Sequence, residues 1–184
     1  MRVLRRWLLR WFYPDMQVSH ICQVPLEKLK AQGVRVLFVD LDNTLIEWGS
    51  GRLGNGVADW LAQAKQMGFQ VVIVSNAGRR ERVARIADQL GVVGFAGAWK
   101  PRRFVFRRYL AIMGIDPSRA AMVGDQLLTD IWGAKRSGIL AILVEPLTAR
   151  RFITGRLQRP LERLLLSLMR RWQCPDIADD RSPR

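Results

Sequence analysis

A buried strand that runs straight into two carboxylates constrains this chain more than any other stretch. Residues 34–39 are mostly β-branched or aromatic, as in a buried strand, and Asp40 and Asp42 follow directly. Two carboxylates this close repel each other unless a cation lies nearby. Parallel sheets hold their ligands at the carboxyl ends of the strands. The stretch therefore predicts a divalent-metal site, although an Asx-turn at Asp42 and Asn43 would produce the same local pattern.

The rest of the chain alternates between strand and helix patterns. Further apolar runs predict strands at residues 71–74, 94–98, 120–123 and 140–144. Amphipathic spacing predicts helices at residues 25–32, 57–68, 80–90, 104–114 and 130–137, the first of them within a connector over 15–32. Such alternation is typical of an α/β fold with a three-layer, Rossmann-like parallel sheet and right-handed crossovers. At 184 residues the chain is long enough to give one such domain a real core.

Polar side chains follow several of these strands. Ser75 follows the second strand, Lys100 precedes a later helix, and Asp125 and Asp130 follow the strand at 120–123. Phosphoryl transfer requires a nucleophile, Mg²⁺ to neutralise phosphate charge, and fixed donors for the phosphate oxygens. Each of these roles has a candidate at the strand ends. Taken singly, Ser75 could be a cap, Lys100 a solvated charge and Asp130 an N-cap.

Four segments of the chain together resemble the four motifs of the haloacid dehalogenase superfamily. They are residues 40–44 (Asp-Leu-Asp-Asn-Thr), 75–76 (Ser-Asn), 100–101 (Lys-Pro) and 124–130 (Gly-Asp-Gln-Leu-Leu-Thr-Asp). The likeness covers residues 15–146 and is greatest to the YqeG-type phosphatases of subfamily IIIA, a group that includes phosphatidylglycerophosphate phosphatases. The resemblance implies a phosphatase built on that superfamily's parallel sheet.

The resemblance also implies a role for each residue of the catalytic motifs. Asp40 would be the nucleophile and a metal ligand, and Asp42 would be the general acid and base. Asp42 would also offer its backbone carbonyl to Mg²⁺. Asp125 would complete the metal site. Lys100 would neutralise the charge of an aspartyl-phosphate formed on Asp40.

The remaining motif residues would support the phosphate and the catalytic groups. Ser75, Asn76 and Thr44 are expected to bind or brace the phosphoryl group, and Asp130 is expected to support Lys100 or the metal shell. The chain contains 2 cysteines and 1 histidine, which gives few candidate residues for catalysis based on cysteine or histidine.

The spacing of the motifs leaves no room for a cap domain over the site. About thirty residues separate Asp42 from Ser75, and a glycine-rich flap at residues 49–56 and one helix account for them. The site is therefore expected to be open. An open site favours a phosphate carried by something large, such as a lipid head group, a protein or a nucleic-acid end.

Both ends of the chain are predicted to form basic amphipathic helices. Residues 1–14 and 147–173 place Leu and Trp on one stripe beside several Arg, and residues 174–184 are expected to be a disordered tail. Such helices are typical of the membrane interface, yet the same stripes could pack on the core. The net charge of +14 favours a polyanionic partner, either anionic lipid or nucleic acid.

The sequence as a whole predicts a Mg²⁺-dependent phosphatase that works on an anionic phospholipid such as phosphatidylglycerophosphate. It is expected on the cytoplasmic face of the membrane as a peripheral protein, or in an organelle if the chain is eukaryotic. Two other functions stay open at this point. One is a phosphatase for nucleic-acid ends or phosphoproteins, and the other is a non-catalytic protein that binds RNA or the ribosome.

Overall fold

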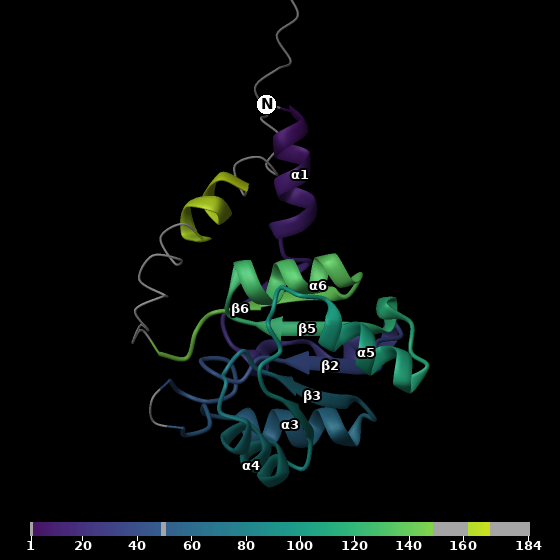
Figure 1. Ribbon diagram of the computed structural model, residues 1–184, viewed down its shortest axis with the longest axis vertical. Helices are drawn as coiled ribbons and strands as arrows, with labels where there is room; N and C mark the ends of the chain where they lie inside the picture. Colours follow the sequence, from purple (N-terminus) through teal and green to yellow (C-terminus); the bar gives the residue numbers. More distant parts are fainter. Residues whose placement is uncertain (1, 49–50, 149–161, 170–184) are drawn as a thin grey trace, which may run out of the picture.

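A parallel sheet forms the centre of the computed structural model, which describes residues 2–48, 51–148 and 162–169 (Figure 1). In this part of the chain the strands form one six-stranded sheet in the order β1-β6-β5-β2-β3-β4, with every neighbouring pair parallel. The strands are β1 (Met16–Val18), β2 (Val36–Val39), β3 (Gln70–Val74), β4 (Val93–Phe95), β5 (Ala120–Gly124) and β6 (Leu140–Val144).

Strand β2 lies at the centre of the sheet. The direction in which the chain adds strands to the sheet reverses on either side of it. Its residues are fully buried, and it pairs with β3 on one side and β5 on the other. The chain leaves β2 for β3 and β4, then crosses back over β2 to β5 and β6. Val39 is in register with Ile73 and Val123. Open parallel sheets form their ligand crevices at this kind of switch point.

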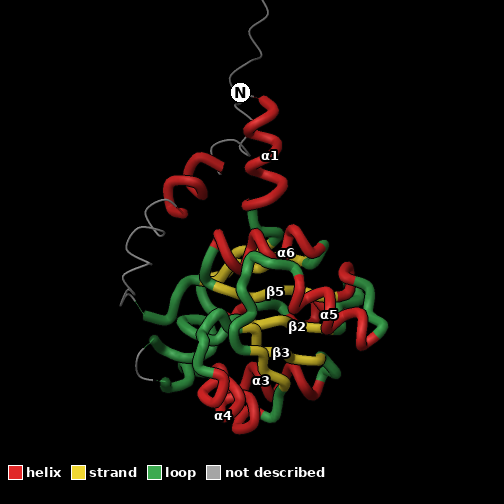
Figure 2. Tube along the Cα trace, in the orientation of Figure 1, coloured by secondary structure: helices red, strands yellow, loops and turns green. Residues whose placement is uncertain are grey.

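Helices surround the strands, as the red and yellow segments of Figure 2 show. Two separate cores lie on the two faces of the sheet, and β2 alternates between them, with Leu37 and Val39 in one and Val36 and Phe38 in the other. One core receives α2 (Leu26–Ala31), α3 (Val57–Gln66) and α4 (Arg80–Leu90), and the other receives α1 (Arg2–Phe12), α5 (Phe104–Met113) and α6 (Trp132–Ser137). The predicted three-layer α/β architecture is therefore confirmed.

Strand β1 departs from the sequence prediction, which places its residues in a connector. It pairs with β6 at the edge of the sheet, with Met16 beside Ile142. Its side chains are half-buried or exposed, so it lacks the continuous apolar run that marks the central strands. A π-helical turn over Leu127–Ile131 also precedes α6, where the sequence predicts a helix that begins near residue 130.

The described residues between Asp42 and Ser75 do not form a separate lid. Ile46 makes an isolated antiparallel bridge to Leu53, and α3 follows. This stretch of the described chain therefore holds no cap domain, as the sequence predicts.

The two terminal segments pack at least partly on the body of the protein. Phe12, at the end of α1, is buried, and its ring lies 5.2 Å from that of Trp132 in α6, whereas Trp7 is half-exposed. Residues 162–169 are helical, and Met169 is buried in the same core as Phe12. Of the helix predicted over residues 147–173, Leu147 and Thr148 are not helical, and residues 149–161 and 170–173 lie outside the described residues, as does the predicted tail. No helix in the described ranges combines the length and the apolar character that crossing a membrane requires.

Candidate active site

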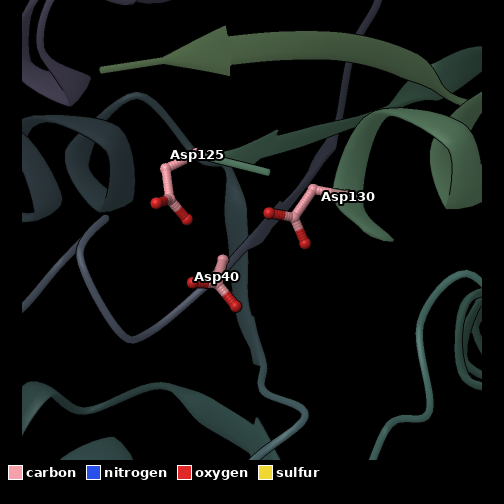
Figure 3. A group of neighbouring side chains, drawn as sticks. All are labelled: Asp40, Asp125 and Asp130. Atoms are coloured by element: carbon pink, nitrogen blue, oxygen red, sulfur yellow. The ribbon is translucent and has the colours of Figure 1, made fainter. Parts of the chain in front are cut away.

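Three carboxylates meet at the carboxyl edge of the sheet, and Figure 3 shows them pointing toward one another. Asp40 follows β2, Asp125 follows β5, and Asp130 lies in the π-helical turn. One oxygen from each carboxylate lies within 4.8 Å of the other two, and all three side chains are buried. Two aspartates 85 or more residues from Asp40 in the sequence thus share its site because neighbouring strands end together.

The sheet itself fixes the position of the first and last of these aspartates. The amide of Asp40 donates to the carbonyl of Val123 at 2.9 Å, which extends the β2–β5 ladder by one residue. A Cβ at Gly124 would lie 2.3 Å from Oδ2 of Asp130, so only glycine allows that carboxylate to approach the strand. Oδ2 of Asp130 also accepts from the amide of Gln126 at 3.1 Å.

Lys100 brings a buried positive charge to these carboxylates. Its Nζ lies 2.5 Å from Oδ1 of Asp40 and 2.7 Å from Oδ1 of Asp130. The side chain of Asn76 holds the backbone of Lys100 on both sides: its Oδ1 accepts from the Lys100 amide at 2.7 Å, and its Nδ2 donates to the Lys100 carbonyl at 3.1 Å. The Asn76 side chain, predicted to act on the phosphate, thus positions the loop that carries the lysine.

Burial dominates the electrostatics of the Asp40–Lys100 pair. It raises the pKa of Asp40 to about 7; Lys100 opposes this shift, while Asp130 and Asp42 add to it. Burial alone would lower the pKa of Lys100, but attraction to Asp130 and Asp40 outweighs it and holds that pKa above its usual range. Lys100 therefore stays charged at neutral pH. A further cation is needed to keep Asp40 fully ionised there.

The carboxylate group fits a hard divalent cation. Mg²⁺ is usually held by one or two carboxylates together with water and substrate oxygens. Oδ2 of Asp40 is buried and accepts no hydrogen bond from the described residues, so it lacks the partner that a buried oxygen requires. Asp40 and Asp125 would hold the ion, with Asp130 beside them and bound to Lys100. The carboxylate of Asp42 is not in this group, which leaves the predicted contact to its backbone carbonyl.

The side chain of Asp42 is instead bound by Arg82 of α4. Nη2 of Arg82 lies 2.6 Å from Oδ1 of Asp42, and Nη1 lies 3.2 Å from Oδ2. This hydrogen bonding raises the pKa of Arg82 above its usual range. The sequence gives no indication of the contact, because Arg82 belongs to a helix whose several arginines are typical of a solvated surface.

The two hydroxyl groups that were predicted to serve the phosphate are both buried. Ser75 follows directly after β3, where its amide donates to the carbonyl of Phe95 at 2.9 Å and its Oγ accepts from the amide of Ala77 at 3.1 Å. The hydroxyl of Thr44 makes no hydrogen bond with the described residues. The buried hydroxyl of Thr44 is thus able to form a further hydrogen bond, and it lies in the loop that carries the predicted nucleophile.

The C-terminal part of the chain touches this loop and the π-helical turn. The amide of Leu147 donates to the carbonyl of Asn43 at 2.9 Å, and the hydroxyl of Thr148 donates to Oδ1 of Asn43 at 2.7 Å. Oε1 of the buried Glu162 accepts from the amide of Leu128 at 3.1 Å. The helical residues 162–169 are therefore joined to the turn that carries Asp130.

Comparison with known proteins gives matches over most of the chain. The family model for haloacid dehalogenase-like hydrolases matches residues 5–138. Probable phosphatase YqeG of Bacillus subtilis (strain 168) is 36% identical over 164 residues, which cover 89% of this chain and 95% of that protein. Phosphatidylglycerophosphate phosphatase 1, chloroplastic/mitochondrial, of Arabidopsis thaliana is 27% identical over 169 residues, which cover 86% of this chain and 47% of the plant protein.

A solved structure has the same fold. The crystal structure of an uncharacterized protein from Listeria monocytogenes serotype 4b superimposes with a TM-score of 0.54 at 23% identity. The match covers 75% of this chain and 99% of the Listeria chain. At this identity the likeness shows the arrangement of strands and helices alone.

Proposed function

Since the chain belongs to the haloacid dehalogenase-like hydrolase family and is a phosphatase, we propose that it hydrolyses a phosphomonoester of an anionic phospholipid, releasing phosphate, with the help of Mg²⁺. The buried pair of Asp40 and Lys100, with Asp125 beside it, carries the chemical part of this proposal. The likeness to the Arabidopsis protein, which is named for phosphatidylglycerophosphate, supports that lipid as the substrate.

The proposed reaction has two steps, both at Asp40. In the first, the carboxylate of Asp40 attacks phosphorus, the ester bond to the leaving oxygen breaks, and Asp42 gives that oxygen a proton. In the second, Asp42 takes a proton from water, the water oxygen attacks phosphorus, and the bond to Asp40 breaks to release phosphate. When bound, Mg²⁺ supplies positive charge for the phosphate oxygens. Lys100 keeps its own charge throughout and holds Oδ1 of Asp40.

Hydroxyl groups at the same edge of the sheet suit the phosphate oxygens. Thr44 has a buried hydroxyl that makes no hydrogen bond with the described residues, and Ser75 lies at the end of β3. Fixed donors of this kind stabilise charge that develops on a transferring phosphoryl group. We assign Ser75 and Thr44 to the phosphate, and Asn76 to the support of Lys100.

Exposed aromatic residues beside the catalytic lysine support a membrane surface as the place of work. Trp99 and Phe104 are 70% and 67% exposed. The guanidinium carbon of Arg102 lies 5.7 Å from the ring centroid of Trp99, and that of Arg108 lies 5.7 Å from the ring centroid of Phe104. Aromatic rings beside basic groups suit the head-group layer of a bilayer, where the ring meets the apolar boundary and the charge meets lipid phosphate.

The charge of the whole chain supports the same location. A net charge of +14 attracts an anionic leaflet, and a basic residue near such a surface contributes about 1 kcal/mol. We therefore propose a peripheral protein at the cytoplasmic face of a membrane. The predicted terminal helices would add to the contact where their apolar stripes are not already packed.

Phosphate release from phosphatidylglycerophosphate in anionic vesicles tests the proposal. We expect Mg²⁺-dependent release that EDTA abolishes and that Asp40→Asn lowers by roughly 10³-fold or more, as expected for loss of a nucleophile. Asp88→Asn, at an exposed position of α4, is the matched control and should keep its activity. Cleavage of aryl phosphates without any release from the lipid would contradict the substrate and make phosphorylated nucleic-acid ends the next choice. An active Asp40→Asn variant would contradict the mechanism.

A further inference from the structure

The carboxylate of Asp42, which the proposed reaction needs for proton transfer, is bound by Arg82 in an ion pair. Each oxygen of Asp42 faces one nitrogen of Arg82, at 2.6 Å and 3.2 Å. Two parallel hydrogen bonds between a guanidinium and a carboxylate form one of the stronger polar contacts in proteins. Each oxygen keeps a second lone pair, but the guanidinium fixes the carboxylate in one orientation. Opening the pair would let Asp42 turn toward a leaving oxygen or a water.

The surroundings of Arg82 indicate what could open the pair. Its side chain is 26% exposed and that of Asp42 is 13% exposed, so an incoming ligand can reach the guanidinium more easily than the carboxylate. Arg79, Arg80 and Arg85, on or next to α4, are exposed and add positive charge around it. A ligand that competes with Asp42 for Arg82 must itself be an anion.

We propose that Arg82 binds a second anionic group of the substrate and, by exchanging Asp42 for that group, frees Asp42 for proton transfer. This inference rests on the proposed function, because it assigns Asp42 to proton transfer. Arg82 is then a residue that positions Asp42 and selects substrates with two anionic groups. The Cα atoms of Asp40 and Asp42 lie at most roughly 7 Å apart, so the ion pair with Asp42 holds Arg82 in the neighbourhood of the proposed nucleophile.

A phospholipid with a terminal phosphomonoester meets this requirement. In phosphatidylglycerophosphate, one glycerol unit separates the phosphodiester from the phosphate that is removed. The phosphodiester is the group that would take the place of Asp42 on Arg82. A simple monoester has no such group and leaves the ion pair closed.

A matched pair of soluble substrates tests the inference without the lipid. Propane-1,3-diol monophosphate and its bisphosphate share the same three-carbon diol and differ in whether its other hydroxyl carries a second phosphate. For the native protein with Mg²⁺, we expect kcat/KM for the bisphosphate to exceed that for the monophosphate by roughly tenfold or more, the scale of one hydrogen bond to a charged group. Arg82→Gln should remove this preference, with a higher KM for the bisphosphate and a higher kcat for the monophosphate, because Asp42 is no longer held by the guanidinium.

Two further variants separate selection from general effects of charge and folding. Arg82→Lys keeps a cation but only one point of contact, so it should restore part of the preference. Arg85→Gln removes the same charge from an exposed position one turn further along α4 and should leave the preference intact. A native protein without the preference, or an Arg82→Gln variant that keeps it, would overturn the inference. An equal loss of kcat/KM for both substrates in Arg82→Gln would also overturn it and leave Arg82 a structural role.

The lipid arm of the experiment has a separate meaning. Short-chain phosphatidylglycerophosphate should follow the bisphosphate and lose activity in Arg82→Gln. If the native protein prefers the soluble bisphosphate but releases no phosphate from the lipid, the proposed lipid substrate is wrong and the role of Arg82 stands.

Discussion

The three aspartates of the active site carry more negative charge than the one positive charge of Lys100 can neutralise. Lys100 contacts both Asp40 and Asp130, and Asp125 lies within 4.8 Å of these carboxylates. Unpaired charge in a buried site is costly, and a cation that pairs with it recovers that cost. The same groups that suit Mg²⁺ therefore lower the stability of the protein when the ion is absent.

This imbalance predicts the pH dependence of stability in EDTA. The pKa of Asp40 rises from 3.8 to about 7 on folding. Between these values the folded state binds more protons than the unfolded state, so the unfolding free energy falls as the pH rises. Asp40→Asn has no carboxylate at this position, so its unfolding free energy does not fall in this way. The variant should therefore melt several degrees above the native protein at pH above 7. A change of ~1 kcal/mol shifts the melting temperature of a domain this size by ~2–4 °C.

Thermal melts of both proteins across the acidic to neutral range check this prediction. The gap between them should close as the pH approaches 4, below which Asp40 is protonated in both states. Adding Mg²⁺ should raise the melting temperature of the native protein and have little effect on Asp40→Asn. Parallel pH profiles for the two proteins would show that Asp40 is not the group responsible.

Site residues can be identified from the sequence where they belong to a recognisable motif next to a strand. Asp40, Asp125 and Lys100 follow or precede strand patterns, so the parallel fold alone brings them to one edge. Asn76 is also named by its motif, but its contact with Lys100, like the contact of Arg82 with Asp42, cannot be found in this way. Each acts through a partner 24 or more residues away, and neither the partner nor the rotamer can be inferred from local spacing.

Among the elements, the junction of β5 with the π-helical turn depends on a single glycine. Gly124 ends β5, and a Cβ there would lie 2.3 Å from Oδ2 and 2.7 Å from Cβ of Asp130. Contacts this short require the turn to move, because a carboxylate oxygen and a carbon cannot approach so closely. Moving the turn would shift Asp130 away from Lys100.

Gly124→Ala is therefore expected to damage catalysis more than stability. We expect kcat to fall by roughly 10²-fold, the scale of a displacement of about 1 Å in a catalytic group. Gly94→Ala provides the control, since its Cβ would lie 2.7 Å from that of Ala87, away from the catalytic aspartates. Phosphate release per folded molecule and urea unfolding, measured for both variants, separate the effects. An active Gly124→Ala variant would show that the turn can adjust without cost.

The elements of the fold follow from sequence periodicity wherever they are long or fully buried. The predicted helix at residues 80–90 has the bounds of α4, and the central strands differ from β2, β3, β5 and β6 by two residues or fewer. Strand β1 could not be found in this way, because its three residues owe their structure to pairing with β6 rather than to an apolar run. Tertiary contact, which local sequence does not record, decides such short edge strands.

For the whole molecule, charge and exposed rings together predict how it meets a bilayer. Binding to anionic vesicles should weaken by roughly tenfold or more from low to high salt, because exposed charges are screened beyond ~10 Å at ~0.1 M salt. Phe104→Ser should weaken binding by about tenfold, given that burial of such a ring contributes ~1.5–3 kcal/mol.

Co-sedimentation with vesicles measures both effects. Ile112→Ser is the matched control, because Ile112 is 73% exposed near the opposite end of α5, roughly 12 Å along the helix from Phe104. Equal loss of binding in the two variants would show that the aromatic end of α5 has no special part. Salt-independent binding would contradict an electrostatic attachment.

The contacts of Leu147 and Thr148 with Asn43 make the segment after β6 part of the active site. In mechanical terms, a pull on Leu147 and Thr148 is borne by Asn43, which adjoins Asp42. A pull from further along the chain first meets Glu162 and Met169, which join residues 162–169 to the turn that carries Asp130 and to the core. A truncation before Leu147 would release the loop that carries the predicted nucleophile, whereas one after Thr148 would keep both hydrogen bonds, so two cut points two residues apart give different enzymes.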